Sequence, residues 1–443
     1  MHRIFTVAVV SACLGGCLHI EPVDEADWDN WRGPGCRGLA TGGNPPIRWS
    51  EQENLLFKIE LPGEGGSSPI VWGDRIYVTS GIKTAKTGTP PVVPDPDARR
   101  FSEPAPTHVH DYVVLAIDRH TGLVLWRKTL CSIVPHEGLH NTMTQVSASP
   151  VTDGEFLYLH FGSRGLYCLD MDGRPVWSKQ LGIMRTRRAY GEASSPALHG
   201  DTLVVNWDHE GDSFVVALDK RTGEERWRRD HEEVTSWSTP LILTVAGRPQ
   251  VIIAATGASR GYDLETGKVI WSCGGMTVNC IPTPVYADGL VYLMSGYRGR
   301  MLQAVRLEGA SGDITDSPQV VWQHREATSY VPSGLLMGSE LYFLRGNTAV
   351  LSCLDAKTGK VHYGGQRLRG LRTIYSSPIG VADRFYITDR GGITKVIGTG
   401  TKYQELASNK LEDTFDASAA IVGDRIYLRG RRYLYAIAQD LAQ

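Results

Sequence analysis

The sequence lacks a strong net charge, closely spaced cysteine pairs and long hydrophobic runs, and each absence excludes a class of protein. Its 46 basic and 48 acidic residues leave a net charge of −2. Polyanion-binding proteins are usually strongly basic, so we do not expect nucleic acid as a main partner. The eight cysteines include no Cys-x-x-Cys pair, so neither a redox dithiol nor a zinc knuckle is indicated. Beyond the N-terminal segment no apolar run reaches about 18 residues, and we predict no transmembrane helix.

Glycine and aromatic residues, in contrast, are abundant. The 443 residues include 49 glycines, 11 tryptophans and 18 tyrosines, and glycine usage of roughly 11% exceeds the ordinary ~7%. The glycines have no collagen spacing. Hydrophobic residues make up 42% and charged residues 21%, which is ordinary for a globular chain and excludes a wholly disordered one. This composition favours short strands joined by tight turns.

The N-terminus has the features of an export signal. Residues 1–16 combine a weakly basic start with an apolar stretch that is too short to span a bilayer. Leu14-Gly15-Gly16-Cys17 resembles the bacterial lipobox, in which the cysteine is lipidated and becomes the first mature residue. We therefore predict a lipoprotein signal peptide over 1–16, lipidation of Cys17, and a tether and lead-in over 17–48. A plain secretory signal is the alternative, and both predict export.

Four further cysteines receive separate predictions. Cys168 and Cys353 lie within strand patterns, where a thiol is usually a small core residue. Cys273 and Cys280 bracket one loop and could form a disulfide in an oxidising compartment. The sequence alone leaves their pairing open.

One pattern, two short strands around a tight turn, occurs eight times along the chain. It starts as SSPIVWGDRIYVTSG at Ser67 and ends as SAAIVGDRIYLRG at Ser418. The equivalent positions in the eight copies are Pro69, Pro150, Pro196, Pro240, Pro284, Gly334, Pro378 and Ala419. The first interval is much longer than the others, which indicates an insertion in the first unit. Gly-Asp between two apolar runs is a strong hairpin signal.

A third strand, a second turn and a fourth strand follow in each copy. The best examples of the turn, written Asp-x-x-Thr-Gly-x-x-x-Trp, run from Asp118 to Trp126 and from Asp219 to Trp227. Asp and Thr side chains can hydrogen-bond the turn backbone, and glycine supplies a positive φ. The terminal aromatic offers a large surface that can pack on the next unit.

Four antiparallel strands repeated about every 44 residues are typical of a β-propeller. The eighth copy has no fourth strand of its own, whereas the segment around Phe57 resembles the fourth strand of the first copy. We therefore predict an all-β, eight-bladed propeller over residues 49–438, closed by an N-terminal strand.

The repeat text Ala-x-Asp-x-x-Thr-Gly-x-x-x-Trp, at 116–126 and 217–227, resembles that of pyrroloquinoline-quinone-type (PQQ-like) propellers. That superfamily includes quinoprotein dehydrogenases, BamB-like outer-membrane assembly lipoproteins and stand-alone repeat proteins. The lipobox and the absence of an added domain in this sequence resemble the last two groups most closely. The resemblance is specific for the fold and says less about function.

The four strands of a propeller blade are lettered A to D from the axis outward. The loops between strands B and C, and those between one blade and the next, share one face, and here these loops vary most. Two of them carry histidines: Ile82–Asp111, ending in His108-Val109-His110-Asp111, and Lys128–Val146, containing His136-Glu137-Gly138-Leu139-His140. The second matches His-Glu-x-x-His, but Pro135 and Gly138 argue against the helix that a zincin needs. One hypothesis is that the side chains meet and bind a metal ion; the alternative is that they only pack the loops. The metal candidates are His108, His110, Asp111, His136 and His140.

The same face gathers arginines and one tryptophan. The arginines are Arg185, Arg187, Arg188, Arg260, Arg298, Arg300, Arg345, Arg367, Arg369 and Arg372. Guanidinium groups suit carboxylates and phosphates, so Arg260 and Arg298 are candidate contacts for a small anionic ligand. Trp237 stands before a strand A near the channel mouth, where an indole can stack on a planar cofactor or plug the channel.

Quinone dependence is the weaker alternative. The resemblance implies an adjacent Cys-Cys disulfide and a Glu/Asn/Asp calcium set in quinoprotein enzymes. This sequence has no adjacent cysteines, and the calcium set is not recognisable in it.

Together these observations predict a monomeric lipoprotein of the periplasm or cell envelope. Its expected role is that of a non-enzymatic scaffold or binding module, with an envelope protein or a small anion as partner. The alternative is an oxidoreductase that depends on PQQ with calcium, or on a divalent metal.

Overall fold

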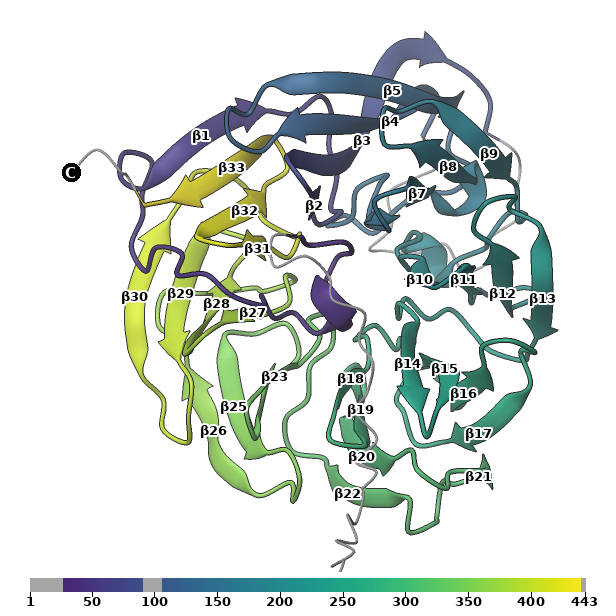
Figure 1. The fold of residues 1–443 in the computed structure, drawn as a ribbon, viewed down its shortest axis with the longest axis vertical. Helices are drawn as coiled ribbons and strands as arrows, with labels where there is room; N and C mark the ends of the chain where they lie inside the picture. Colours follow the sequence, from purple (N-terminus) through teal and green to yellow (C-terminus); the bar gives the residue numbers. More distant parts are fainter. Residues whose placement is uncertain (1–26, 91–105, 440–443) are drawn as a thin grey trace, which may run out of the picture.

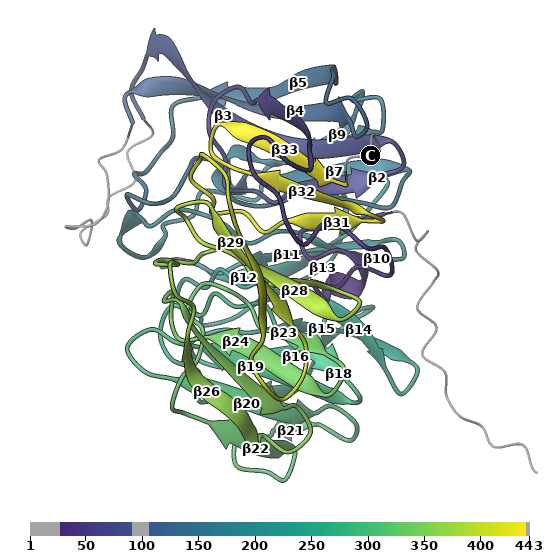
Figure 2. The same cartoon turned by 90° about the vertical axis from the view of Figure 1, so that its left-hand side faces the viewer.

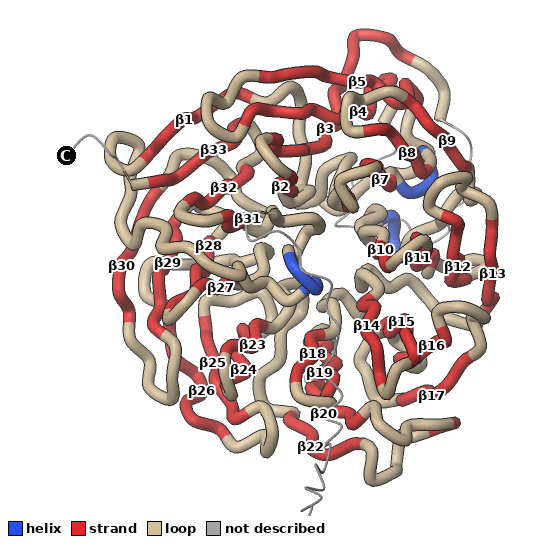
Figure 3. Tube along the Cα trace, in the orientation of Figure 1, coloured by secondary structure: helices blue, strands red, loops and turns tan. Residues whose placement is uncertain are grey.

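The computed structural model describes residues 27–90 and 106–439, which form eight antiparallel sheets arranged as blades around a central axis (Figure 1). The predicted all-β, eight-bladed propeller is confirmed. The predicted signal peptide and Cys17 lie outside the described residues. Within the described residues, helices are confined to three short 3-10 segments, η1 (Pro34–Cys36), η2 (Gly162–Arg164) and η3 (Arg187–Ala189), which are blue in Figure 3. Within the described ranges, no helix has the length and apolar character needed to cross a membrane.

Each blade runs from an inner strand A to an outer strand D. The first four blades consist of β2 (Ile70–Trp72), β3 (Arg75–Thr87), β4 (His108–Asp118) and β5 (Val124–Ile133); β6 (Val151–Thr152), β7 (Phe156–His160), β8 (Leu166–Asp170) and β9 (Pro175–Lys179); β10 (Ala197–His199), β11 (Thr202–Trp207), β12 (Phe214–Asp219) and β13 (Glu225–Asp230); and β14 (Leu241–Val245), β15 (Arg248–Ile253), β16 (Ser259–Asp263) and β17 (Val269–Cys273).

Blades five to eight follow the same order. They consist of β18 (Val285–Ala287), β19 (Leu290–Ser295), β20 (Met301–Arg306) and β22 (Val320–His324); β23 (Leu335–Met337), β24 (Glu340–Leu344), β25 (Val350–Asp355) and β26 (Val361–Arg367); β27 (Ile379–Val381), β28 (Arg384–Thr388), β29 (Ile393–Gly398) and β30 (Glu405–Lys410); and β31 (Ala420–Val422), β32 (Arg425–Arg429), β33 (Tyr433–Ala438) and β1 (Leu55–Glu60). The short strand β21 (Gly312–Asp313) adds to the outer edge of blade four in parallel with β17; the sequence pattern did not predict this strand.

Strand β1 closes the ring. It pairs antiparallel with β33, and Phe57 lies opposite Ala436 and Lys58 opposite Tyr435. The outer strand of the last blade therefore comes from the start of the chain. This confirms the closure predicted from the missing fourth strand.

The Asp-Thr-Gly turns hold the outer hairpins as the sequence predicts. In the first, Asp118 Oδ1 accepts hydrogen bonds from the backbone N–H and the hydroxyl of Thr121, both at 2.8 Å. The same contacts occur at Asp355 and Thr358, at 2.8 and 2.6 Å. Gly122 has a φ of 75°, and its backbone N–H bonds to the Asp118 carbonyl at 2.9 Å.

Outer-strand aromatics join neighbouring blades. The Trp177 indole donates to the Lys220 carbonyl of the next blade at 2.9 Å, and the Trp227 indole donates to the Leu264 carbonyl at 2.7 Å. A Cβ on Gly223 would lie 2.7 Å from the Trp177 ring. Glycine is therefore required in this turn for two reasons: the backbone has a positive φ, and the aromatic ring leaves no room for a Cβ.

A closed ring of side-chain hydroxyls links all eight blades around the axis. The backbone N–H just before each strand A donates to the hydroxyl of the equivalent residue in the next blade, over 2.9–3.2 Å. The last bond, from Ser418 to Ser68, completes the circle at 3.0 Å. We call these residues the hydroxyl ring: Ser68, Ser149, Ser195, Thr239, Thr283, Ser333, Ser377 and Ser418. All eight are buried.

Residues 27–48 cross the axis on the side of the short A–B turns. Trp28 pairs with Val71 of blade one, and the backbone N–H of Thr152 in blade two donates to the Asp29 carbonyl at 3.0 Å. Further along the segment, the Ala40 backbone N–H donates to the Gly380 carbonyl of blade seven at 2.9 Å. Figure 1 shows η1 near the centre of the ring. We call 27–48 the crossing segment.

Blade one extends beyond the others. Strands β3 and β4 have 13 and 11 residues, and their hairpin projects from the ring in the side view of Figure 2. His108, His110 and Asp111 were predicted in a loop but lie in strand β4. The ladder continues past the usual blade length because Lys83 still pairs with His110 and Thr87 with His108.

Candidate functional site

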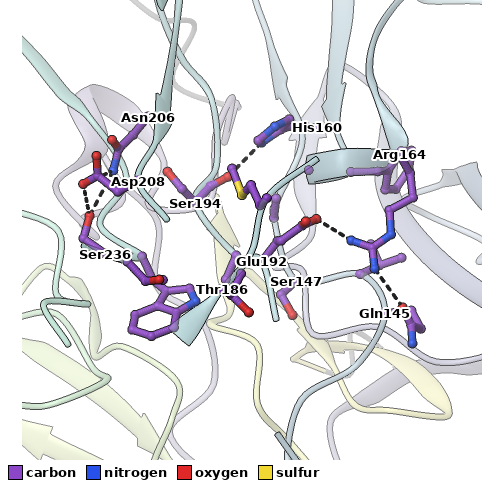
Figure 4. A pocket seen from close by; sticks show the side chains of 18 residues that line it. Gln145, Ser147, His160, Arg164, Thr186, Glu192, Ser194, Asn206, Asp208 and Ser236 are labelled. Atoms are coloured by element: carbon purple, nitrogen blue, oxygen red, sulfur yellow. Dashed lines mark hydrogen bonds and ion pairs between the residues drawn. The ribbon is translucent and has the colours of Figure 1, made fainter. Parts of the chain in front are cut away.

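A small polar pocket lies on the loop-rich face, where the connections between the first four blades meet. Its free volume is about 20 Å³, which is room for one water-sized guest. Figure 4 shows Arg164 and Glu192 on one side of this pocket and Asn206, Asp208 and Ser236 on the other, with His160 above them. We call it the loop pocket. It lies on the face where the sequence predicts function, and that prediction stays untested by the pocket alone.

A buried ion pair forms one wall of the loop pocket. The Arg164 guanidinium bonds to Glu192, whose other oxygen accepts the Ser163 hydroxyl. Both charged side chains are about 5% exposed. The remaining Arg164 donors bond to the Tyr112 hydroxyl at 3.1 Å and to Gln145 Oε1 at 3.3 Å. The Glu192 carboxylate raises the pKa of Arg164 against the effect of burial, and Arg164 holds the pKa of Glu192 low.

The structure does not assemble the predicted metal cluster. Among the described residues, the one group with metal-ligand spacing is His136, Glu137 and Glu192, whose ligand atoms lie within 4.8 Å of one another. Only His136 of this group was a predicted ligand. Its Nε2 donates to the Met184 carbonyl at 2.7 Å and lies 3.7 Å from Glu192 Oε1. Because this nitrogen carries the proton, its lone pair is not available to a metal.

The other predicted ligands have separate partners. His110 Nδ1 contacts the His108 carbonyl at 3.0 Å, and Asp111 accepts the Ser132 hydroxyl at 2.6 Å. His140 Nδ1 contacts the Thr142 hydroxyl at 2.7 Å. The prediction that the two loops bring these side chains to one ion is wrong in this structure, because the β3–β4 extension places His108, His110 and Asp111 on strand β4.

Glu137 is unusual because it is buried beside a second carboxylate. Burial and the nearby Glu192 charge raise its pKa to about 8. Its oxygens accept the Thr186 hydroxyl at 2.5 Å and the Thr186 backbone N–H at 3.2 Å. At neutral pH this carboxyl is therefore mostly protonated, and Arg164 with Glu192 forms a balanced pair beside it.

The far wall of the loop pocket is also hydrogen-bonded. Asp208 Oδ1 contacts His231 Nε2 at 2.6 Å, and Oδ2 accepts the Ser236 hydroxyl at 2.5 Å. Asn206 donates to Asp208 at 3.3 Å and to Ser236 at 3.1 Å. His160 Nδ1 contacts the Ser194 carbonyl at 3.1 Å. Together with Glu192, this wall has the Glu, Asn and Asp residue types of a calcium set. The carboxylate oxygens already have protein partners, whereas the buried Asn206 Oδ1 and His160 Nε2 have none among the described residues.

The predicted ligand contacts Trp237, Arg260 and Arg298 do not converge. Trp237 lines the loop pocket, is 7% exposed, and donates from its indole to the Gly191 carbonyl at 2.7 Å. The Arg260 guanidinium pairs with Glu233 at 2.6 Å. Arg298 lies over the ring of Tyr297 at 5.6 Å, and neither Arg298 nor Arg260 lines the loop pocket. Trp237 is therefore a buried wall residue of the loop pocket, and both of its predicted roles, stacking on a cofactor and plugging the channel, stay predictions.

Cys273 and Cys280 are both buried and unbonded to each other. The Cys273 thiol faces Gln303 Oε1 at 3.6 Å and the Cys280 thiol faces the Met294 carbonyl at 3.7 Å. Cys168 and Cys353 are buried in strands, as the core interpretation predicts.

A second, larger cavity lies on the axis. We call it the axial cavity; its volume is about 150 Å³. Its wall includes seven members of the hydroxyl ring, and it is also lined by Trp31 of the crossing segment and by Trp237 and Tyr375. Trp237, Ala193 and Ser147 line both cavities, so the two are neighbours.

Neither cavity accommodates a three-ring quinone. A cavity of about 150 Å³ holds a single benzene ring, and the loop pocket is far smaller. The charged groups around Trp237 are also paired with one another. The residues present therefore do not fit PQQ.

The sequence interpretation missed the hydroxyl ring, the crossing segment and Glu192. A signal for the ring was present, because the residue before each of the eight equivalent positions is serine or threonine. Glu192 offered no such signal, since its partner Arg164 lies 28 residues away on another loop.

Comparisons with known proteins agree with this architecture. The class defined by the fold and its Asp-Thr-Gly-Trp turns is the PQQ-like repeat propeller. A family model described as "Outer membrane protein assembly factor BamB" matches residues 109–364. The chain therefore belongs to this BamB family of PQQ-like repeat β-propellers.

Individual relatives are distant. The chain is 26% identical over 322 residues to a polyvinylalcohol dehydrogenase of Sphingopyxis sp. (strain 113P3), covering 60% of this chain and 47% of that protein. It is 28% identical over 108 residues to BamB of Francisella salina, covering 24% and 18%. The matches thus span less than half of these relatives' lengths. The BamB structure of Moraxella catarrhalis superposes with a TM-score of 0.53 at 14% identity, over 81% of this chain and 98% of that one; this shows a shared fold.

Proposed function

We propose that this protein is an exported, lipid-anchored binding module of the cell envelope that docks a protein partner and catalyses no reaction. The observation that carries the proposal is the BamB family match over residues 109–364. In support, the loop-rich face presents charged groups that neutralise one another. Arg164 pairs with Glu192 and Arg260 with Glu233, which leaves no cationic or nucleophilic group free for catalysis at these positions.

The proposed docking element is the outer edge of blade one. Strand β5 has 10 residues and exposes Val124, Leu125 and Ile133, which are 49%, 48% and 40% accessible. Leu123, just before it, is 67% accessible. An outer strand offers unpaired backbone groups, and an extended partner segment can add to such an edge. The apolar side chains favour a partner strand with apolar residues at alternate positions.

Site-specific photocrosslinking in native envelopes tests this proposal. A photoreactive residue at Leu125 should capture a discrete envelope protein. The matched control is Val361, which is 44% exposed on the outer strand of blade six. Capture from both positions, or from neither, would contradict docking at blade one. Capture only from Ile183, 48% exposed on the loop-rich face, would move the docking surface to that face.

Lipidation and localisation are tested on the mature protein. We expect a mass increment on Cys17 and release from membranes only by detergent. With Cys17→Ser, the protein should become soluble in the periplasm or the medium. An unmodified Cys17 in the mature protein would contradict the proposed lipid anchor.

The second candidate function is a quinone- or metal-dependent oxidoreductase. The similarity to a polyvinylalcohol dehydrogenase over 60% of the chain favours it, whereas the cavity volumes oppose it. Titration with PQQ and calcium, followed by absorbance and a dye-linked dehydrogenase assay, separates the two. Stoichiometric quinone with turnover would overturn the binding-module proposal.

A further inference from the structure

The hydroxyl ring leaves a set of proton donors at the axial cavity. Each ring hydroxyl accepts a backbone N–H from the preceding blade. Each therefore still has its own O–H proton to donate. Within residues 27–90 and 106–439, none of these protons is bonded to a protein acceptor. Seven of the eight residues line the cavity, so a ring of O–H donors surrounds it.

A buried positive charge lies beside this ring. Arg32, next to Trp31 in the floor of the axial cavity, is fully buried. Its guanidinium donates to the carbonyls of Gly334 at 2.7 Å, Pro378 at 3.4 Å and Arg37 at 3.1 Å. Gly334 and Pro378 directly follow two members of the hydroxyl ring. All these acceptors are neutral. The Nε of Arg32 has no partner in the described part of the chain.

A second buried guanidinium lies on another side of the ring. Arg429 is also fully buried, and it bonds to the Ser67 hydroxyl at 2.5 Å and the Ser80 hydroxyl at 3.0 Å. Ser67 precedes the ring member Ser68. The Nε of Arg429, like that of Arg32, has no partner among the described residues. Asp413 exerts a weak favourable field on Arg429, but no carboxylate in that part of the chain forms an ion pair with Arg429 or Arg32.

The one carboxylate that lines the axial cavity is already neutralised. Asp416 accepts hydrogen bonds from Arg390 at 2.5 Å and from Arg431 at 3.3 Å. Arg431 also forms an ion pair with Glu64 at 4.0 Å, so these four side chains balance one another. The excess of positive charge around the cavity therefore comes from Arg32 and Arg429.

Charges buried with only neutral partners are costly and are usually paired. Burial lowers the pKa of Arg32 to about 10 and that of Arg429 to about 9, yet both groups remain protonated at neutral pH. A guest with negative charge would offset this cost, and a ring of hydroxyl protons would solvate it.

We propose that the axial cavity binds a small oxyanion, a carboxylate or a phosphate group, held by the O–H donors of the hydroxyl ring in the positive field of Arg32 and Arg429. The volume of about 150 Å³ is enough for one six-membered ring. Trp31, Trp237 and Tyr375 provide apolar wall for the remainder of such a ligand. The site is separate from the docking edge of blade one and does not depend on the function proposed above.

A matched ligand series tests charge and size together on the full mature protein. Benzoate, benzyl alcohol and benzamidine have the same ring with negative, neutral and positive substituents. Inorganic phosphate separates a phosphate-type ligand from a carboxylate. Binding is followed by calorimetry and by tryptophan fluorescence, since two indoles line the cavity. We expect benzoate or phosphate to bind at least tenfold more tightly than benzyl alcohol, and benzamidine not to bind. Equal affinities across the series, or no binding at 10 mM by either anion, would overturn the proposal.

Substitutions then locate the binding site. Thr239→Val retains the shape of the ring residue but removes its O–H, and we expect affinity to fall about tenfold. Thr239→Ser retains a hydroxyl and should bind within about twofold of the parent protein. Arg32→Met should reduce affinity more than Thr239→Val does. If Arg32→Met does not fold, the two Thr239 variants still test the proposal. Equal anion affinities of Thr239→Val and Thr239→Ser would show that the anion binds elsewhere.

Discussion

Two sets of buried arginines in the same ring are held in opposite ways. On the loop-rich face, Arg164 pairs with Glu192, and the carboxylate raises the guanidinium pKa. At the axis, the hydrogen bonds of Arg32 and Arg429 go only to carbonyls and hydroxyls among the described residues, and burial lowers the pKa values of both groups. The buried guanidinium of the loop pocket thus has a carboxylate partner, whereas those beside the axial cavity form no ion pair among the described residues. The axis is the most regular part of the fold, yet it is where an external negative charge is needed.

The largest expected effect on stability comes from breaking the ion pair between Arg164 and Glu192. Glu192→Gln leaves Arg164 buried without a counter-charge, and we expect a loss of about 3–5 kcal/mol in the free energy of unfolding. Urea unfolding measures it. The control is Glu225→Gln, which removes a partly exposed partner of Arg228 and should cost no more than about 1 kcal/mol. Similar losses in the two variants would show that Arg164 does not depend on its pair.

The next effect depends on pH. The pKa of Glu137 is raised from its ordinary value of 4.5 to about 8, so its contribution to stability is complete below pH 4.5 and is lost as the pH rises to about 8. Glu137→Gln does not ionise. Its stability relative to the parent protein should therefore increase by a few kcal/mol between pH 5 and pH 8. Urea unfolding at both pH values tests this, and a constant difference would show that Glu137 titrates normally.

A smaller effect is expected within the hydroxyl ring. Ser377→Ala leaves the backbone N–H of Ser333 without an acceptor in a buried site, which should cost about 1–3 kcal/mol. Ser377→Thr retains the hydroxyl and serves as the control. Equal stability of Ser377→Ala and the parent protein would mean that water replaces the lost acceptor.

The smallest expected effect on stability distinguishes the arginines at the axis from those paired with carboxylates on the loop-rich face. If the axial cavity binds an oxyanion, ligand at ten times its dissociation constant should stabilise the fold by about 1.4 kcal/mol. Arg429→Met should abolish this stabilisation. Arg260→Met, at a guanidinium that Glu233 already compensates, should retain it. Thermal unfolding with and without the anion measures this stabilisation. If both variants lost it, the arginines at the axis would not differ from those paired on the loop-rich face.

The ring could be predicted from the sequence because its signals are local. Each hairpin turn and each Asp-Thr-Gly turn lies within a few residues, and eight copies repeat the same text, so the fold and the closure by the segment around Phe57 followed. The repeat also fixes which loops share a face, so the loops that line the loop pocket could be placed together from the sequence.

The site chemistry was less predictable because it depends on contacts between distant residues. His136 and Glu137 were visible as a motif, but their neighbour Glu192 lies on the connection between blades two and three. His108, His110 and Asp111 were lost from the predicted cluster because β4 starts earlier than the blade repeat indicates. Arg32 lies in a segment that was predicted as a lead-in, and only its contacts with blades six and seven show its burial.

The crossing segment also determines how the molecule would respond to tension. A pull on residue 27 reaches the Trp28–Val71 bridge and the Asp29–Thr152 bond first. Arg32 and the Gly38–Gly380 backbone bond, 2.8 Å long, then transfer the load to the far side of the ring. The closing strand β1 begins only at Leu55, behind all of these attachments. Force along the chain would therefore be distributed over several blades in shear before it could peel off the strand that closes the ring.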